Sequence, residues 1–241
     1  HSRQTLEEAA GAARERLNES LMQARSLSEM RGDASSPVAT FLALGAQQRL
    51  ELARLVTLSD FALDTLCRRP ELLAELIESG ELERALPPRE LSARLAEGLS
   101  AAEDEKAMQQ VLRRFRQLRM LGIIWRDLNG TGMWDTAGAV SRLAEVSLEG
   151  ALGGLEAFLE PRYGRPAADR FGEPQRLVVL GMGKLGSYEL TAGSDVDIIL
   201  LYDHDPGSDE SDGPKPLDPV RYYTRMTQRL VAALSAPTAE G

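Results

Sequence analysis

Only two short segments of this chain have the composition of β-strands, and both lie in its last third. Residues 5–159 are rich in Leu, Ala, Glu and Arg and nearly free of β-branched runs, which predicts consecutive helices. Residues 177–180 then form an apolar run that predicts a fully buried strand, and a second run follows at 196–202. The chain is therefore expected to fold as a helical domain followed by an α/β domain.

The helical part shows several boundaries of its own. Residues 49–66 carry one apolar stripe with spacings of three, four and seven, which predicts a helix that packs on its neighbours; its members are Leu52, Leu55, Val56, Leu63 and Leu66. Further helices are predicted at 71–77 and 111–127, and another, capped by Asp135, runs to about 159. A closing helix at 219–235 begins with proline. Trp125 and Trp134 are expected to anchor helix packing.

These patterns divide the chain into three parts. Residues 1–45 are predicted to be a helical lead-in or linker, 46–172 a helical domain, and 173–241 the opening of an α/β domain that is incomplete at its C-terminus. Because the chain begins with His1 and has no signal-peptide pattern, we expect it to be a fragment of a longer protein.

Composition excludes several classes of function. Asp and Glu number 37 against 28 Lys and Arg, so the net charge is -9 and broad nucleic-acid binding is not expected. A nucleotide is compatible with this charge, because a metal ion supplies positive charge locally. The single cysteine, Cys67, cannot form an internal disulfide, and the chain has no apolar run of about 18 residues that would span a membrane. A reducing, cytoplasmic location is expected.

A glycine-rich turn follows the first predicted strand. Gly181, Gly183 and Gly186 leave this strand and enter a short helix, an arrangement that presents backbone N–H groups to phosphate. Lys184 is placed to neutralise a phosphate oxygen, and Ser194 to donate a hydrogen bond to one. These five residues are the predicted nucleotide contacts.

Asp195 and Asp197 lie at the start of the second predicted strand. Residues two apart on a strand point to the same face, about 7 Å apart. Two carboxylates held this close repel each other unless a cation lies between them. We therefore predict that both residues bind Mg²⁺ and are catalytic in phosphoryl or nucleotidyl transfer. An isolated Asp-x-Asp is more often a solvated strand edge, and the adjacent glycine turn argues against that interpretation.

The same turn also matches the dinucleotide-binding pattern Gly-x-Gly-x-x-Gly. In that alternative, Asp203 would bind a ribose hydroxyl. A dinucleotide-binding unit needs a full crossover helix between its strands, and only residues 184–191 are available for one. It also leaves Asp195 and Asp197 without a role. Dinucleotide binding is therefore the weaker hypothesis.

Residues 180–203, LGMGKLGSYELTAGSDVDIILLYD, resemble the signature of the glutamine synthetase adenylyltransferase and adenylyl-removing enzymes. The resemblance covers most of the chain after about residue 50, and further segments carry it: 59–61, 69–73, 114–116, 124–127 and 223–230. It departs from the family at Ser187 and Tyr188, which stand where small residues are common.

The resemblance implies a nucleotidyltransferase domain of the DNA polymerase β-like fold that acts on glutamine synthetase in nitrogen regulation. One half of such enzymes removes AMP from a tyrosine by phosphorolysis, giving ADP, and the other half adds AMP from ATP. Residues 124–127 and 181–183 resemble the removing half, which is the interpretation that we adopt. The alternative is the adding half, which 191–194 and 203–241 resemble. The family also implies a PII-type signal protein as partner and a third acidic ligand beyond Gly241. The non-enzymatic alternative is a docking or regulatory module that keeps the fold.

Overall fold

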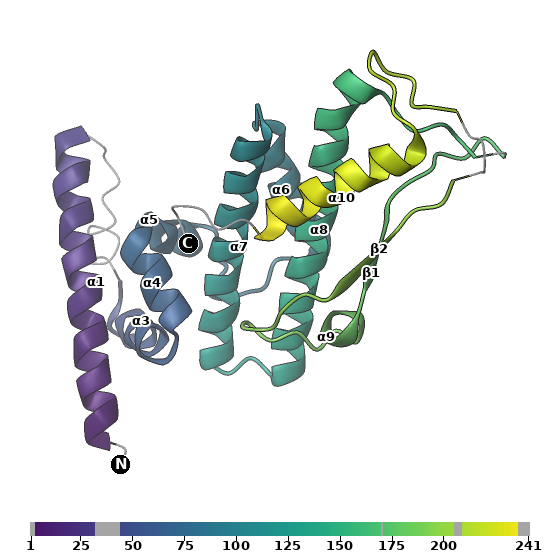
Figure 1. The fold of residues 1–241 in the computed structure, drawn as a ribbon. Coiled ribbons are helices and arrows are strands. Elements are labelled where there is room, and N and C mark those ends of the chain that lie inside the picture. The colour runs from purple at the N-terminus through teal and green to yellow at the C-terminus, as the bar shows by residue number, and fades with distance from the viewer. Residues whose placement is uncertain (1–2, 32–43, 170, 205–208, 236–241) are drawn as a thin grey trace. The chain divides into compact units, whose positions relative to one another are not determined.

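Helices account for most of the structure, a computed structural model that describes residues 3–31, 44–169, 171–204 and 209–235 (Figure 1). In the described residues one two-stranded sheet accompanies them. The elements are α1 (Arg3–Arg31), α3 (Ala46–Leu58), α4 (Asp60–Arg68), α5 (Glu71–Glu78), α6 (Pro88–Ser100), α7 (Glu105–Leu128), α8 (Met133–Tyr163), β1 (Val178–Gly181), α9 (Gly183–Gly186), β2 (Ile198–Leu201) and α10 (Pro219–Ser235). Within these residues, no helix is both long and apolar enough to cross a lipid bilayer.

The predicted helices are present, with one break that the apolar stripe did not reveal. The stripe in residues 49–66 is split at Ser59, which ends α3 and caps α4 by accepting a hydrogen bond from the Ala62 N–H at 3.2 Å. Serine favours this position because its side chain replaces the missing helical acceptor. All five stripe residues are buried, so the prediction of a packing face is confirmed.

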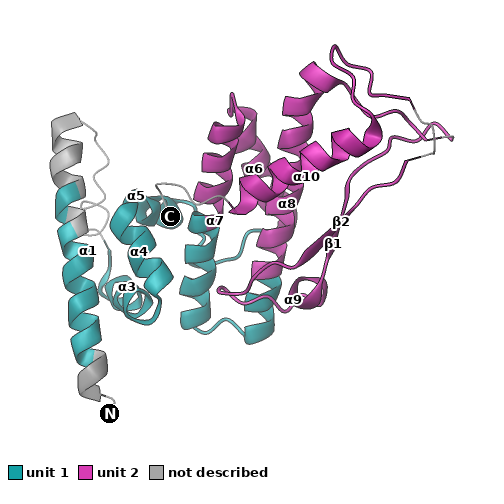
Figure 2. Ribbon diagram, viewed as in Figure 1, with its two compact units in different colours: residues 1–86, 117–139 teal, residues 87–116, 140–241 magenta. Residues whose placement is uncertain are grey.

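The chain separates into two compact units, residues 1–86 with 117–139 and residues 87–116 with 140–241 (Figure 2). The long helices α7 and α8 each contribute residues to both units. The predicted boundaries at 45 and 172 follow from sequence texture and stay predictions.

The first unit has a core of leucines from α1, α3, α4, α5 and α7, together with Trp125, which is 2% exposed. The prediction for Trp125 is confirmed, whereas that for Trp134 is wrong, because its side chain is 68% exposed. Trp134 lies in the first turn of α8, where the chain has only just left the Asn-Gly-Thr-Gly turn. Asp135 also lies in this first turn, so it complements the helix dipole instead of capping the helix as predicted.

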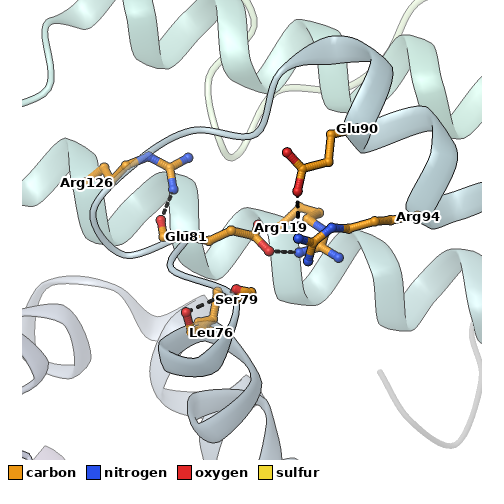
Figure 3. A network of polar contacts seen from close by, with 7 residues as sticks. All are labelled: Leu76, Ser79, Glu81, Glu90, Arg94, Arg119 and Arg126. Carbon is orange, nitrogen blue, oxygen red and sulfur yellow. Dashed lines mark hydrogen bonds and ion pairs between the residues drawn. The ribbon is translucent and has the colours of Figure 1, made fainter.

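A buried acidic residue holds the turn after α5 in this unit. Glu81 is 3% exposed, and its carboxylate accepts a charged hydrogen bond from Arg119 of α7, while its backbone carbonyl accepts one from Arg126 (Figure 3). Burial lowers the pKa of both guanidinium groups, but this does not remove their charge, because the ordinary arginine pKa lies far above neutral pH. In the other unit, Arg94 pairs with Glu90 along α6 at 2.7 Å.

The second unit is built around α8. Gly150 and Gly154 of this helix allow close approach, because a Cβ atom on Gly150 would lie 2.6 Å from the Leu95 side chain and one on Gly154 would lie 2.7 Å from the Met108 sulfur. Helices α6 and α7 therefore pack directly against the backbone of α8.

Helix α10 completes this unit through polar and aromatic contacts. Arg225 donates to the Tyr163 hydroxyl at 2.8 Å, and Arg229 pairs with Glu105 of α7 at 2.6 Å. Tyr223 stacks on Tyr202, at the end of β2, with ring centroids 4.7 Å apart. The predicted helix at 219–235 is confirmed, and the Asp218 side chain caps it by accepting from the Arg221 N–H at 3.0 Å.

Strands β1 and β2 pair antiparallel, with Val178 opposite Leu201 and Leu180 opposite Ile199. These four side chains share one face of the sheet and are 42–49% exposed. The prediction of a fully buried strand is therefore wrong. An apolar strand is buried on both faces only when other elements pack against both faces. The described elements leave the face with Val178, Leu180, Ile199 and Leu201 half-exposed.

The loop after β2 returns to the end of α8 at a crossing of two glycines. A Cβ atom on Gly164 would lie 2.1 Å from the Gly213 nitrogen, and one on Gly213 would lie 2.1 Å from the Gly164 nitrogen. Buried Ser211 fastens the crossing, since its hydroxyl donates to the Tyr163 carbonyl and accepts from the Leu217 N–H. The loop that precedes α10 is thus fixed to α8.

Candidate functional site

The predicted glycine turn connects β1 to the single-turn helix α9. The N–H of Met182 donates to the carbonyl of Asp197 at 2.8 Å, which extends the pairing of the two strands by one step. Gly183 follows with a φ of +51°, in the left-handed region that favours glycine. In the described part of the chain, the N–H groups of Gly183 and Lys184 have no backbone acceptor, which leaves them available to a ligand.

The outer two glycines of the turn have a packing role. A Cβ atom on Gly186 would lie 2.7 Å from the Gly181 carbonyl oxygen, and one on Gly181 would lie 2.9 Å from the side chain of Leu185. A side chain at either position would push the turn open. Their role as nucleotide contacts stays a prediction, whereas their role in closing the turn follows from this geometry.

Asp195 and Asp197 lie in the extended segment just before β2, and both are exposed. A carboxylate oxygen of Asp197, Oδ2, lies 3.4 Å from the position that a Cβ atom would take on Gly183. The structure therefore brings the acidic segment and the glycine turn together. Neither carboxylate has a hydrogen-bond or ion-pair partner in the described residues, and no group of three His, Cys, Asp or Glu side chains there is arranged to hold a metal ion.

Lys184 and Ser194 occupy different surroundings. Lys184 is exposed on α9 and has no ion-pair partner in the described residues. Ser194 is half-buried, and its hydroxyl accepts from the Thr191 N–H at 3.0 Å and lies 2.8 Å from the Thr191 hydroxyl. Ser194 thus closes the loop that leads to Asp195. Its predicted contact with phosphate stays a prediction.

Helix α8 supports the turn through two of its own residues, Ser141 and Glu145, that the sequence did not single out. The Tyr188 hydroxyl donates to Glu145, and the Leu190 N–H donates to the buried hydroxyl of Ser141 at 3.3 Å. These contacts join residues more than 40 positions apart. No local sequence pattern indicates such a pairing.

The strand pairing also bears on the dinucleotide alternative. That fold places its phosphate-binding turn between parallel strands joined by a crossover helix. Here the strands are antiparallel, and the connection holds only the four-residue helix α9. Asp203, the residue that would contact a ribose, is exposed after β2, and its side chain accepts from the N–H of His204. The geometry therefore argues against dinucleotide binding.

Comparison with known proteins gives a consistent family assignment. The profile of the glutamate-ammonia ligase adenylyltransferase family matches residues 50–241. Three relatives share the name bifunctional glutamine synthetase adenylyltransferase/adenylyl-removing enzyme. The protein of Thioalkalivibrio sulfidiphilus is 45% identical over 79% of this chain, that of Pseudomonas aeruginosa 40% over 81%, and that of Mesorhizobium japonicum 48% over 72%.

The matched region is a small part of each relative. It amounts to 19%, 20% and 17% of their respective lengths, so the chain spans about a fifth of the curated relatives that it matches. The family profile covers most of the chain, including the glycine turn and the acidic pair. The chain belongs to the glutamate-ammonia ligase adenylyltransferase family.

Proposed function

We propose that the glycine turn and the acidic pair bind the phosphates of a nucleotide with Mg²⁺, as part of an enzyme that transfers AMP on a tyrosine of glutamine synthetase. The observation that carries this proposal is the position of Asp197 against Gly183. The Asp197 carboxylate, which attracts a cation, thus lies beside a turn whose N–H groups can donate to phosphate. The name of the relatives supports the substrate. A nucleotidyltransferase domain of the DNA polymerase β-like fold and a PII-type protein partner belong to the same proposal.

The two carboxylates have the chemistry that Mg²⁺ requires. Mg²⁺ prefers oxygen ligands and is usually held by one or two carboxylates together with substrate phosphates. Asp195 and Asp197 are exposed and unpaired in the described residues, so neither has to leave another partner to bind an ion. When bound, the ion would neutralise phosphate charge and polarise a phosphoryl oxygen.

The remaining residues of the turn act on the phosphate directly. The N–H groups of Gly183 and Lys184 donate to phosphate oxygens, and the Lys184 ammonium neutralises one of them. Gly181 and Gly186 keep the turn closed, so that these donors converge. Preorganised donors of this kind stabilise charge without rearranging during the reaction.

Two directions of AMP transfer use the same groups. Removal consumes phosphate and adenylylated glutamine synthetase and releases ADP, and residues 124–127 and 181–183 favour it by resemblance. Addition consumes ATP and releases pyrophosphate, and residues 191–194 favour it. Because the relatives are bifunctional, the direction is identified by assaying the full-length protein that contains this chain with each pair of substrates, with and without Asp195→Asn. The product that the variant no longer releases, ADP or pyrophosphate, gives the direction.

The metal ligands are tested by Asp195→Asn and Asp197→Asn in the same protein. Each variant should lose about 100-fold or more of the one activity that this chain supplies and keep its fold, because a ligand is lost while like-charge repulsion is relieved. Asp203→Asn is the matched control. It removes an exposed carboxylate that follows the C-terminal end of β2, whereas Asp195 and Asp197 precede the strand, and it should retain activity. Activity within a few-fold of wild type in either ligand variant contradicts the metal assignment.

Binding separates this proposal from its alternatives. Calorimetry on the chain itself should detect ATP binding that is weak and is lost when Mg²⁺ is chelated, whereas NAD should not bind. NAD binding that survives chelation and is tighter than ATP binding would favour a dinucleotide site. A full-length protein that turns over both substrate pairs at the wild-type rate with Asp195→Asn and with Asp197→Asn would favour a docking module.

A further inference from the structure

The segment after α9 contains a bulky residue in an unfavourable backbone conformation. Tyr188 has a φ of +61°, and it is the one non-glycine residue with positive φ among those described. This region is sterically disfavoured for residues with a Cβ atom, and an aromatic residue stays there only when the surrounding structure holds it. The contacts of Tyr188 should therefore reveal what is being held.

Tyr188 is held by helix α8. Its hydroxyl donates to the carboxylate of Glu145, which lies one helical turn beyond Ser141, the acceptor for the Leu190 N–H. The N–H of Tyr188 donates to the carbonyl of Leu185 at 3.1 Å, inside the glycine turn. Tyr188 thus connects the glycine turn to α8.

Packing accounts for only part of this connection. A cavity of about 360 Å³ lies between the same face of α8 and the turn, and Glu145, Leu148, Leu152, Gly181, Gly186 and Tyr188 are among its lining residues. The glycines that the turn needs for closure contribute no side chains to fill it. Buried Leu185 and Leu190 supply part of the contact with α8, and hydrogen bonds add to the hold where the cavity leaves the turn unpacked.

We propose that Tyr188 and Glu145 are positioning residues, whose hydrogen bond fixes the glycine turn against α8 and so keeps Gly183 beside Asp197. Its consequence for nucleotide binding rests on the proposed function, whereas the hold on the turn does not. The bond to Glu145 raises the pKa of Tyr188, and the charge of Glu149 acts in the same direction while Arg142 opposes it. The hydroxyl therefore keeps its proton at neutral pH.

Hydrogen exchange in the chain tests the hold directly. In Tyr188→Phe and Glu145→Leu, the amides of Leu185, Gly186 and Ser187 should exchange about 5-fold or more faster than in wild type, as expected when a hydrogen bond to a charged acceptor is lost. Glu145→Gln keeps an acceptor oxygen for the phenol and should stay within about twofold of wild type. Glu149→Leu is the matched control, because it makes the same change on the same cavity wall without breaking the bond to Tyr188.

Calorimetry with Mg²⁺ and ATP gives the second readout. Tyr188→Phe and Glu145→Leu should weaken ATP binding by about 5-fold, the same factor by which they accelerate amide exchange at the turn. Glu145→Gln and Glu149→Leu should leave ATP binding unchanged. Unchanged exchange at the turn in both disrupting variants overturns the proposal, and so does equal acceleration in Glu149→Leu. If wild type binds no nucleotide while the exchange pattern appears as expected, the proposed function fails and the positioning role stands.

Discussion

Substitution of Gly183 by alanine tests whether the turn and Asp197 form one site. Gly183 has a φ of +51°, and the left-handed conformation costs a residue with a Cβ atom about 1–2 kcal/mol. Alanine also restricts the unfolded chain, which returns about 0.4–1 kcal/mol. The free energy of unfolding should therefore fall by about 1 kcal/mol. The new methyl group would lie 3.4 Å from the Asp197 carboxylate, so it should reduce nucleotide binding more than it reduces stability.

Two other glycines of the same unit separate these effects. Gly172 has a φ of +84° and nothing within 4 Å of the position that a methyl group would take, so Gly172→Ala introduces backbone strain without a contact. Gly193 has equally open surroundings and no positive φ, so Gly193→Ala should leave stability unchanged or slightly higher. Urea unfolding measures the stability of the three variants, and calorimetry with Mg²⁺ and ATP measures binding.

The expected order is specific. Gly172→Ala and Gly183→Ala should lose similar stability, and only Gly183→Ala should also lose ATP affinity. If Gly183→Ala binds ATP as tightly as Gly172→Ala, the contact between Gly183 and Asp197 is not part of a nucleotide site. If its stability equals that of Gly193→Ala, the turn does not require a left-handed residue at this position.

Three further predictions concern the two cores. Glu81→Ala should lower the free energy of unfolding by about 3–5 kcal/mol in urea titration, because it removes the carboxylate that pairs with the buried Arg119 guanidinium; the exposed Glu78→Ala serves as control and should change little. Tyr223→Phe should raise stability by about 1 kcal/mol, because its buried hydroxyl has no partner in the described residues, and a loss of stability would contradict this reasoning. Burial raises the pKa of Tyr222 and of Tyr223 to about 12. The unfolded chain releases the phenol protons at about pH 10, before the folded chain does, so the free energy of unfolding should decline as pH rises from about 10 to 12. Thermal unfolding at several pH values measures this decline, and Tyr222→Phe should make it less steep.

The helices were predictable because their causes are local. Leucine spacing, the proline that opens α10 and the Asn-Gly turn before α8 act within a few residues. The break at Ser59 was not predicted, because the apolar stripe continues through it and conceals the cap. The exposure of Trp134 and of β1 was missed for a different reason. Burial depends on what covers a residue, and a strand sequence does not state which faces are covered.

The candidate site was predictable in part. A short connection after β1 keeps the glycine turn near the acidic segment, and the structure has Asp197 beside Gly183. The support from Glu145 was not predictable, since it joins positions 43 residues apart through one hydroxyl group. The unusual conformation of Tyr188 is visible only in the backbone. Sequence therefore predicts which groups would carry the chemistry, whereas the structure indicates which groups hold the turn in place.

The crossing of Gly164 and Gly213 restricts how this sequence can vary during evolution. Each glycine lies where the other's backbone leaves no room for a side chain, so a mutation at one position cannot be compensated by a change at the other. We expect both positions to remain glycine in sequences that keep this crossing and to lose that restriction together in sequences that abandon it. The segment between them contains β1, α9 and β2, so the crossing ties both ends of the candidate site to the same point at the end of α8. Two invariant glycines that bracket the glycine turn and the acidic pair would therefore identify this crossing in distant relatives from sequence alone.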